Sequence, residues 1–85
     1  MPIISRFLGI SASMYYLDHD PPHFHVAYGG FRATVGIRDG VVRGQFPRRA
    51  AAHAREWLAL HRAELETNWE RARRREPLFP ITPLE

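Results

Sequence analysis

Apolar side chains occupy every second position in two successive runs, Phe24, Val26 and Tyr28 and then Phe31, Ala33, Val35 and Ile37. This period of two is typical of strands that bury one face. The pairs Gly29-Gly30 and Asp39-Gly40 interrupt the apolar runs, and both suit two-residue hairpin turns that need positive φ. The pattern therefore predicts a three-stranded antiparallel meander over residues 23–45.

Two more strands are predicted ahead of this meander. Residues 3–8 are largely apolar and end near Gly9, and Met14–Leu17 is a short run of large apolar and aromatic side chains. Such residues are enriched in strands. The sheet is therefore expected to have three to five strands.

The period changes after Pro47, a residue that is accepted at the start of a helix. Large side chains then recur every four residues, which places them on one face of a helix over about 48–75. We expect this face to cover the sheet, with Leu65 between Trp57 and Trp69. The region is either one helix or two helices joined by a kink near His61.

The chain of 85 residues is predicted to be one α+β domain. Residues 1–46 form a small antiparallel sheet, and residues 47–76 form the helical region of one or two helices that packs against it. Residues 77–85 contain three prolines, which exclude regular helix, and are expected to form an extended tail.

All 12 basic residues are arginines, and the formal net charge is +3. Arginine suits phosphate and carboxylate groups, so an acidic protein or a nucleic acid is a candidate partner. The alternative is that both helix ends are simply solvated, since cations at the last turn also complement the helix dipole. The candidate binding residues at the two ends of the helix are Arg48, Arg49, Arg71, Arg73, Arg74 and Arg75.

The chain has no cysteine, which excludes disulfides and thiolate chemistry and fits a reducing compartment. No apolar run approaches 18 residues, so no membrane-spanning helix is expected. The first six residues do not resemble a secretory signal. We therefore expect a cytoplasmic protein with no membrane partner.

Side chains that can bind metal or transfer protons are most concentrated between Asp18 and Val26, where three histidines and two aspartates lie close together in the sequence. His23 and His25 on one strand point to the same face, roughly 6.5–7 Å apart. Two imidazoles at this spacing can converge on a divalent metal ion, and His19 or Asp18 can supply a third ligand. Three protein ligands plus water is the form of a catalytic zinc site.

Two other interpretations of this segment are open. In a structural one, the aspartates are turn formers, His23 and His25 are the half-exposed face of a strand, and His19 bonds a loop carbonyl. In a chemical one, a metal-free ribonuclease uses histidine as acid or base and arginine to stabilise the phosphoryl oxygens. The candidate catalytic residues for that chemistry are Arg6, His19, His23 and His25, with Tyr15 or Tyr16.

Strand alternation places His23 and His25 opposite Phe24 and Val26. Because Phe24 and Val26 must face the helix, the histidine face is expected to be reachable by solvent or by a partner.

Several segments together resemble a known bacterial family. They are Pro2–Phe7, Met14-Tyr15-Tyr16, the core Pro21-Pro22-His23-Phe24-His25-Val26, Pro47–Ala50, Asn68-Trp69 and Pro83-Leu84. On these residues the chain resembles the family named domain of unknown function 4160, over nearly its whole length.

The resemblance implies a small stand-alone bacterial protein, often encoded beside a second small protein and labelled with it as a toxin–antitoxin module. It implies no catalytic residue set. The expected function is an interaction component that binds its cognate partner protein, and DNA or RNA with it. The alternatives are a small histidine- and arginine-dependent ribonuclease toxin and a histidine-based metal-binding regulator.

Overall fold

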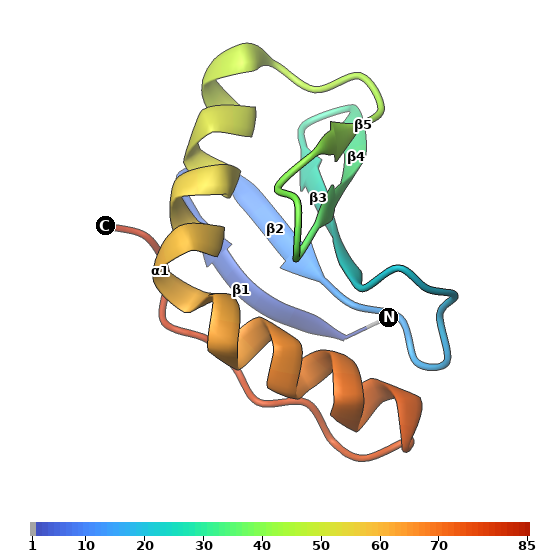
Figure 1. Cartoon of the computed structure of the whole chain (residues 1–85). Coiled ribbons are helices and arrows are strands. Elements are labelled where there is room, and N and C mark those ends of the chain that lie inside the picture. The colour runs from blue at the N-terminus through green and yellow to red at the C-terminus, as the bar shows by residue number, and fades with distance from the viewer. Residues whose placement is uncertain (1) are drawn as a thin grey trace.

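The computed structural model describes residues 2–85 and consists of one sheet followed by one helix (Figure 1). The five strands are antiparallel and neighbour each other in chain order, so the sheet is a simple meander. This confirms the α+β prediction. The elements are β1 (Ile3–Phe7), β2 (Ile10–Ser13), β3 (His23–Tyr28), β4 (Phe31–Gly36), β5 (Val42–Arg43) and α1 (Arg48–Arg73).

The predicted meander over residues 23–45 is confirmed as β3, β4 and β5, but the second turn is wider than predicted. β4 ends at Gly36 and β5 begins at Val42, so Asp39-Gly40 lies within a five-residue connection and is not a two-residue turn. Tyr28 pairs with Phe31, so Gly29 and Gly30 are the two residues of the turn, and Gly29 has a φ of +56°. A side chain with a Cβ is strained at this φ, which explains the glycine at this turn.

The predicted strand at Met14–Leu17 is wrong. The strand lies just before it, at β2, where Ala12 pairs with Val26 of β3 and is fully buried. The chain turns after Met14, and Leu17 takes a φ of +56° outside any strand. Strand propensity favoured the larger residues, but pairing with β3 decides which residues join the sheet.

Helix α1 covers one face of the sheet, as predicted. Trp57 packs against Phe7 and Phe24, with ring centroids 4.9 and 5.5 Å away, and Leu65 and Trp69 are also buried. The helix has non-helical backbone angles at His61, φ −127° and ψ 24°. The sequence left open whether this region is one helix or two, and the structure has two helical arms joined by a kink at His61. Figure 1 shows the two arms of α1 running at an angle to each other.

The tail after α1 runs back along the helix beside β1 (Figure 1). The buried side chain of Asn68 bonds both the carbonyl and the N–H of Phe79, at 2.8 and 2.9 Å. Further on, the N–H of Ile81 donates to the carbonyl of Ile4, and the indole N–H of Trp57 donates to the carbonyl of Thr82. The tail therefore closes the edge of the core between α1 and β1.

Within residues 2–85, no helix combines the length and the apolar character needed to cross a bilayer.

Candidate metal centre

The loop between β2 and β3, residues 14–22, folds back so that Asp18 faces the start of β3. The backbone N–H of Leu17 donates to the carbonyl of Ala72 near the end of α1, which ties the loop to the helix. The exposed residues Asp20 and Arg73 add an ion pair of 3.5 Å between the same two segments. These contacts place Asp18 beside His23 and His25, which lie on the same side of β3.

The carboxylate of Asp18 meets both imidazoles. Its Oδ2 lies 2.9 Å from Nε2 of His23 and 3.1 Å from Nε2 of His25. One ligand atom from each of the three side chains can be chosen so that all lie within 4.8 Å of one another. The prediction that His23 and His25 share a face and converge is confirmed, and Asp18 is the third member of the group.

The other nitrogen of His23 is already occupied. Its Nδ1 lies 2.8 Å from the carbonyl oxygen of Pro21, and because a carbonyl only accepts, this nitrogen carries the proton. A neutral ring then has its lone pair on Nε2, pointing at Asp18. Two lone pairs facing each other at 2.9 Å repel, so this gap suits either a second proton on the ring or a cation.

The distances suit a small divalent ion. Zinc bonds to imidazole nitrogen and carboxylate oxygen are about 2.0–2.2 Å, which puts neighbouring ligand atoms of a tetrahedral site about 3.3–3.6 Å apart. The separations of 2.9 and 3.1 Å around Asp18 Oδ2 are hydrogen-bond distances a few tenths of an ångström below this edge, so the three side chains need to move only slightly apart to hold an ion. The Nδ1–H bond of His23 to a backbone carbonyl is also the outer contact that orients most metal-bound histidines.

The carboxylate of Asp18 is held in its charged form. Burial alone would raise its pKa, but the hydrogen bond to His25, the N–H of His19 and the charge of His23 together lower the pKa below its ordinary value. Ionised Asp18 therefore stabilises the fold above the ordinary carboxyl pKa, and this contribution is lost as the pH falls through the lowered value. At neutral pH, Asp18 is therefore an anion.

The prediction that the histidine face is reachable holds only in part. His23 is 8% exposed, because the returning loop covers it on one side and Trp69 lies 5.2 Å from its ring on the other. His25 is half-buried, and Tyr15 meets it edge-on with ring centroids 4.4 Å apart. The group is thus packed on two sides and open toward the outer surface of the sheet.

The remaining candidate residues of the histidine segment lie outside this group. The side chain of His19 is 83% exposed, and its Nδ1 is 3.9 Å from the other oxygen of Asp18. Arg6 pairs with Ser11, two strands away from β3, and lines a hollow with Leu8 and Gly9 that contains no histidine. The structure therefore joins Tyr15 to the pair of histidines but does not bring Arg6 to them.

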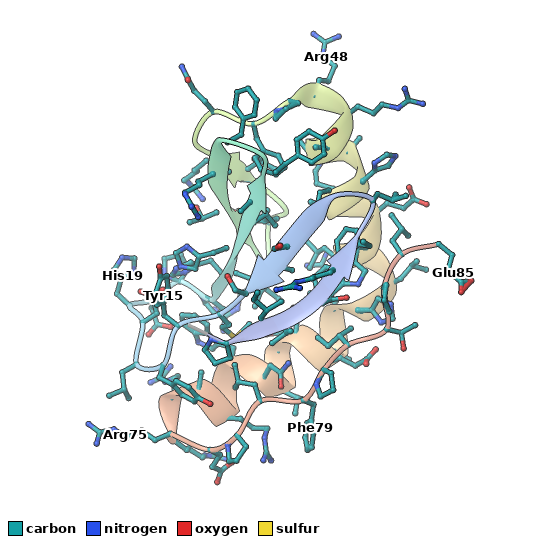
Figure 2. The ribbon with its side chains drawn as sticks, turned by 180° about the vertical axis from the view of Figure 1, so that it is seen from behind. Tyr15, His19, Arg48, Arg75, Phe79 and Glu85 are labelled. Carbon is teal, nitrogen blue, oxygen red and sulfur yellow. The ribbon has the colours of Figure 1, made fainter. Side chains whose placement is uncertain are left out.

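The arginines at the two ends of α1 do not form one surface. Figure 2 shows Arg48 at the top of the molecule and Arg75 near the bottom. Arg71 is engaged with the tail: its Nε donates to the carbonyl of Pro77, and its guanidinium lies 4.2 Å above the ring of Phe79. This structural role could not be predicted from the sequence, because the partners of Arg71 belong to a tail without regular structure.

A comparison with protein-family models matches residues 9–70 to the family described as domain of unknown function (DUF4160). The match covers more than half of the chain, and the protein belongs to this family. No curated protein and no solved structure matches the chain.

Proposed function

We propose that this member of the family binds a divalent transition-metal ion of the zinc type through Asp18, His23 and His25. One observation carries the proposal: a carboxylate oxygen and two Nε2 atoms converge, while the Nδ1–H of His23 is already bonded to a backbone carbonyl. Two imidazoles and one carboxylate are ligands that zinc accepts, and they leave one position for water or a partner group.

The bound ion would join two parts of the chain. Asp18 belongs to the loop that contacts the end of α1, whereas both histidines belong to β3. Metal binding therefore links the loop to the sheet and stabilises the folded state, because the three ligands converge only when the chain is folded. This is the property expected of a metal-binding regulator.

Equilibrium dialysis against micromolar zinc, followed by elemental analysis, tests the proposal. We expect one ion per chain for the wild type and a large loss of binding for Asp18→Asn and for His25→Gln. His53→Gln is the matched control, because His53 is half-buried on α1 and takes no part in the group. Equal binding by Asp18→Asn and the wild type would refute the site.

We further propose that the protein acts in the cytoplasm as the binding component of a two-protein pair of the toxin–antitoxin kind, with nucleic acid as a second ligand. The family resemblance, the excess of arginine and the absence of cysteine support this proposal. A sheet that α1 covers on one face only leaves the second face free for a partner.

Co-expression with the protein encoded beside it, followed by size-exclusion chromatography, tests the pairing. The two chains are expected to elute as one complex. Separate elution of the two chains, both with zinc and without it, would contradict the proposed pairing. Growth arrest on expression of this chain alone, abolished by changing His23 and His25 together to Gln, would instead favour the toxin role.

A further inference from the structure

The five strands of the sheet carry positive charges and no negative ones. All six glutamates follow Arg48, so they lie on α1 or in the tail, and the five strands contain no Asp or Glu. The strands do contain three arginines, Arg6, Arg32 and Arg43. The strands are therefore basic, and none of their arginines has a carboxylate beside it on the strands; α1 and the tail carry eight arginines against the six glutamates.

Strand pairing places all three arginines on the side of the sheet that α1 does not cover. Residues that pair across neighbouring antiparallel strands lie on the same face. Arg6 pairs with Ser11, Arg32 with Ala27, and Arg43 with Thr34. We call this side the outer face, and its members are Ile3, Arg6, Ser11, Ser13, His23, His25, Ala27, Arg32, Thr34, Gly36 and Arg43.

The centre of the outer face is a hollow in which apolar side chains lie among hydroxyl-bearing ones. Ser13, His25, Thr34 and Arg43 form one cross-strand row from β2 to β5. Small and hydroxyl-bearing side chains between the arginines leave a hollow, which is lined by Ile3, Ser11, Tyr15, His25 and Arg32 among others. All three arginines are exposed, and Arg43 has one weak partner, Asp39 at 3.9 Å.

An aromatic ring stands at the edge of this hollow. Tyr15 is 43% exposed and is held in place by its edge-on contact with His25. Figure 2 shows Tyr15 and His19 at the same end of the molecule. A basic surface with an exposed aromatic ring is the combination that binds single-stranded nucleic acid, because bases stack on the ring while cations contact the phosphates.

We infer that the outer face binds the phosphodiester backbone of a single-stranded nucleic acid through Arg6, Arg32 and Arg43, with a base stacked on Tyr15. The inference rests on the nucleic-acid part of the proposed function and does not depend on the metal centre. It differs from the sequence-based expectation, which assigned nucleic acid to the arginines at the ends of α1. An acidic peptide would also match the positive charge of the outer face, but its carboxylates do not stack on the exposed ring of Tyr15 as a base does.

Fluorescence anisotropy with labelled 12-nucleotide oligo(U) and oligo(dT) tests the inference. The two probes distinguish RNA from DNA as the source of the backbone. With three phosphate contacts, the logarithm of the association constant should fall with the logarithm of the salt concentration, with a slope of about −2. Arg6→Gln, Arg32→Gln and Arg43→Gln together should weaken binding at least about tenfold and bring the slope close to zero. Tyr15→Ala alone should weaken binding with little change in slope.

The matched control removes three arginines elsewhere, Arg48→Gln, Arg49→Gln and Arg75→Gln, and should keep most of the affinity. An equal loss in this control would overturn the assignment to the outer face while leaving nucleic-acid binding intact. Binding of a labelled oligoglutamate peptide but of neither oligonucleotide would overturn both. Circular dichroism of each variant confirms that exposed arginines were removed without unfolding the chain.

Discussion

The imidazole of His23 lies 5.2 Å from the indole of Trp69, measured between ring centroids. One residue begins β3 and the other lies near the end of α1, so this contact joins the candidate metal centre to the helical layer. It also places one of the two tryptophans of the chain beside the proposed ion.

This contact predicts an optical signal for metal binding. Co²⁺ is a zinc-like ion that quenches nearby indole fluorescence, so it should quench the emission of Trp69 in the wild type at one equivalent. Asp18→Asn should abolish this saturable quenching, and His53→Gln should leave it unchanged. In Trp69→Phe the remaining emission of Trp57 should respond weakly. Quenching of Asp18→Asn as strong as that of the wild type would place the ion elsewhere.

Zinc should also stabilise the fold. A ligand present at 100 times its dissociation constant and bound only by the folded state adds about 2.7 kcal/mol. For a domain of this size that gain raises the Tm by about 10–20 °C. Differential scanning calorimetry with zinc, and again after adding EDTA, measures it. A rise of the same size in His25→Gln would contradict binding at this centre.

The packing of the helix on the sheet gives a prediction that does not involve the metal. Trp57 is fully buried against Phe7 and Phe24, so Trp57→Ala should lower the free energy of unfolding by about 3–5 kcal/mol. Leu60→Ala, at an exposed position of the same helix, is the control and should change it by less than about 0.5 kcal/mol. Urea denaturation measures both, and a loss below about 1 kcal/mol for Trp57→Ala would show that this face is not core.

The pattern of apolar residues in the sequence was sufficient to predict most of the sheet and the helix. The alternation and the glycine pairs predicted β3 and β4 and the turn between them, and the four-residue recurrence predicted the buried face of α1. Strand β2 was not found, because Ser11, Ala12 and Ser13 have little strand propensity. Its place in the sheet comes from pairing with β3, a contact that a local pattern does not contain.

The candidate site, like the sheet, could be predicted from the sequence only in part. The spacing of His23 and His25 was sufficient to place two imidazoles on one face, but the third ligand stayed open between His19 and Asp18. The structure selects Asp18 because the loop reverses at Leu17 and is held there by a hydrogen bond to Ala72, 55 positions along the chain. A contact over such a separation leaves no pattern in the local sequence.

The docking of the tail gives a further prediction. Asn68 is fully buried and bonds both backbone groups of Phe79, so Asn68→Ala should cost about 1–3 kcal/mol of stability. The tail should also become more accessible to a protease in limited proteolysis. Thr67→Ala, an exposed neighbour on α1, is the control. An unchanged cleavage rate of the tail in Asn68→Ala would show that other contacts hold it.

Anomalous diffraction at the zinc absorption edge, from crystals of zinc-equilibrated protein, tests whether an ion binds between Asp18, His23 and His25. We expect one strong anomalous peak with bonds of about 2.0–2.2 Å to Asp18 Oδ2 and to Nε2 of His23 and of His25. The Nδ1 of His23 should still bond the carbonyl of Pro21. Density that shows only a direct Asp18–His23 hydrogen bond in the zinc-equilibrated crystal, with no peak between the three side chains, would contradict it.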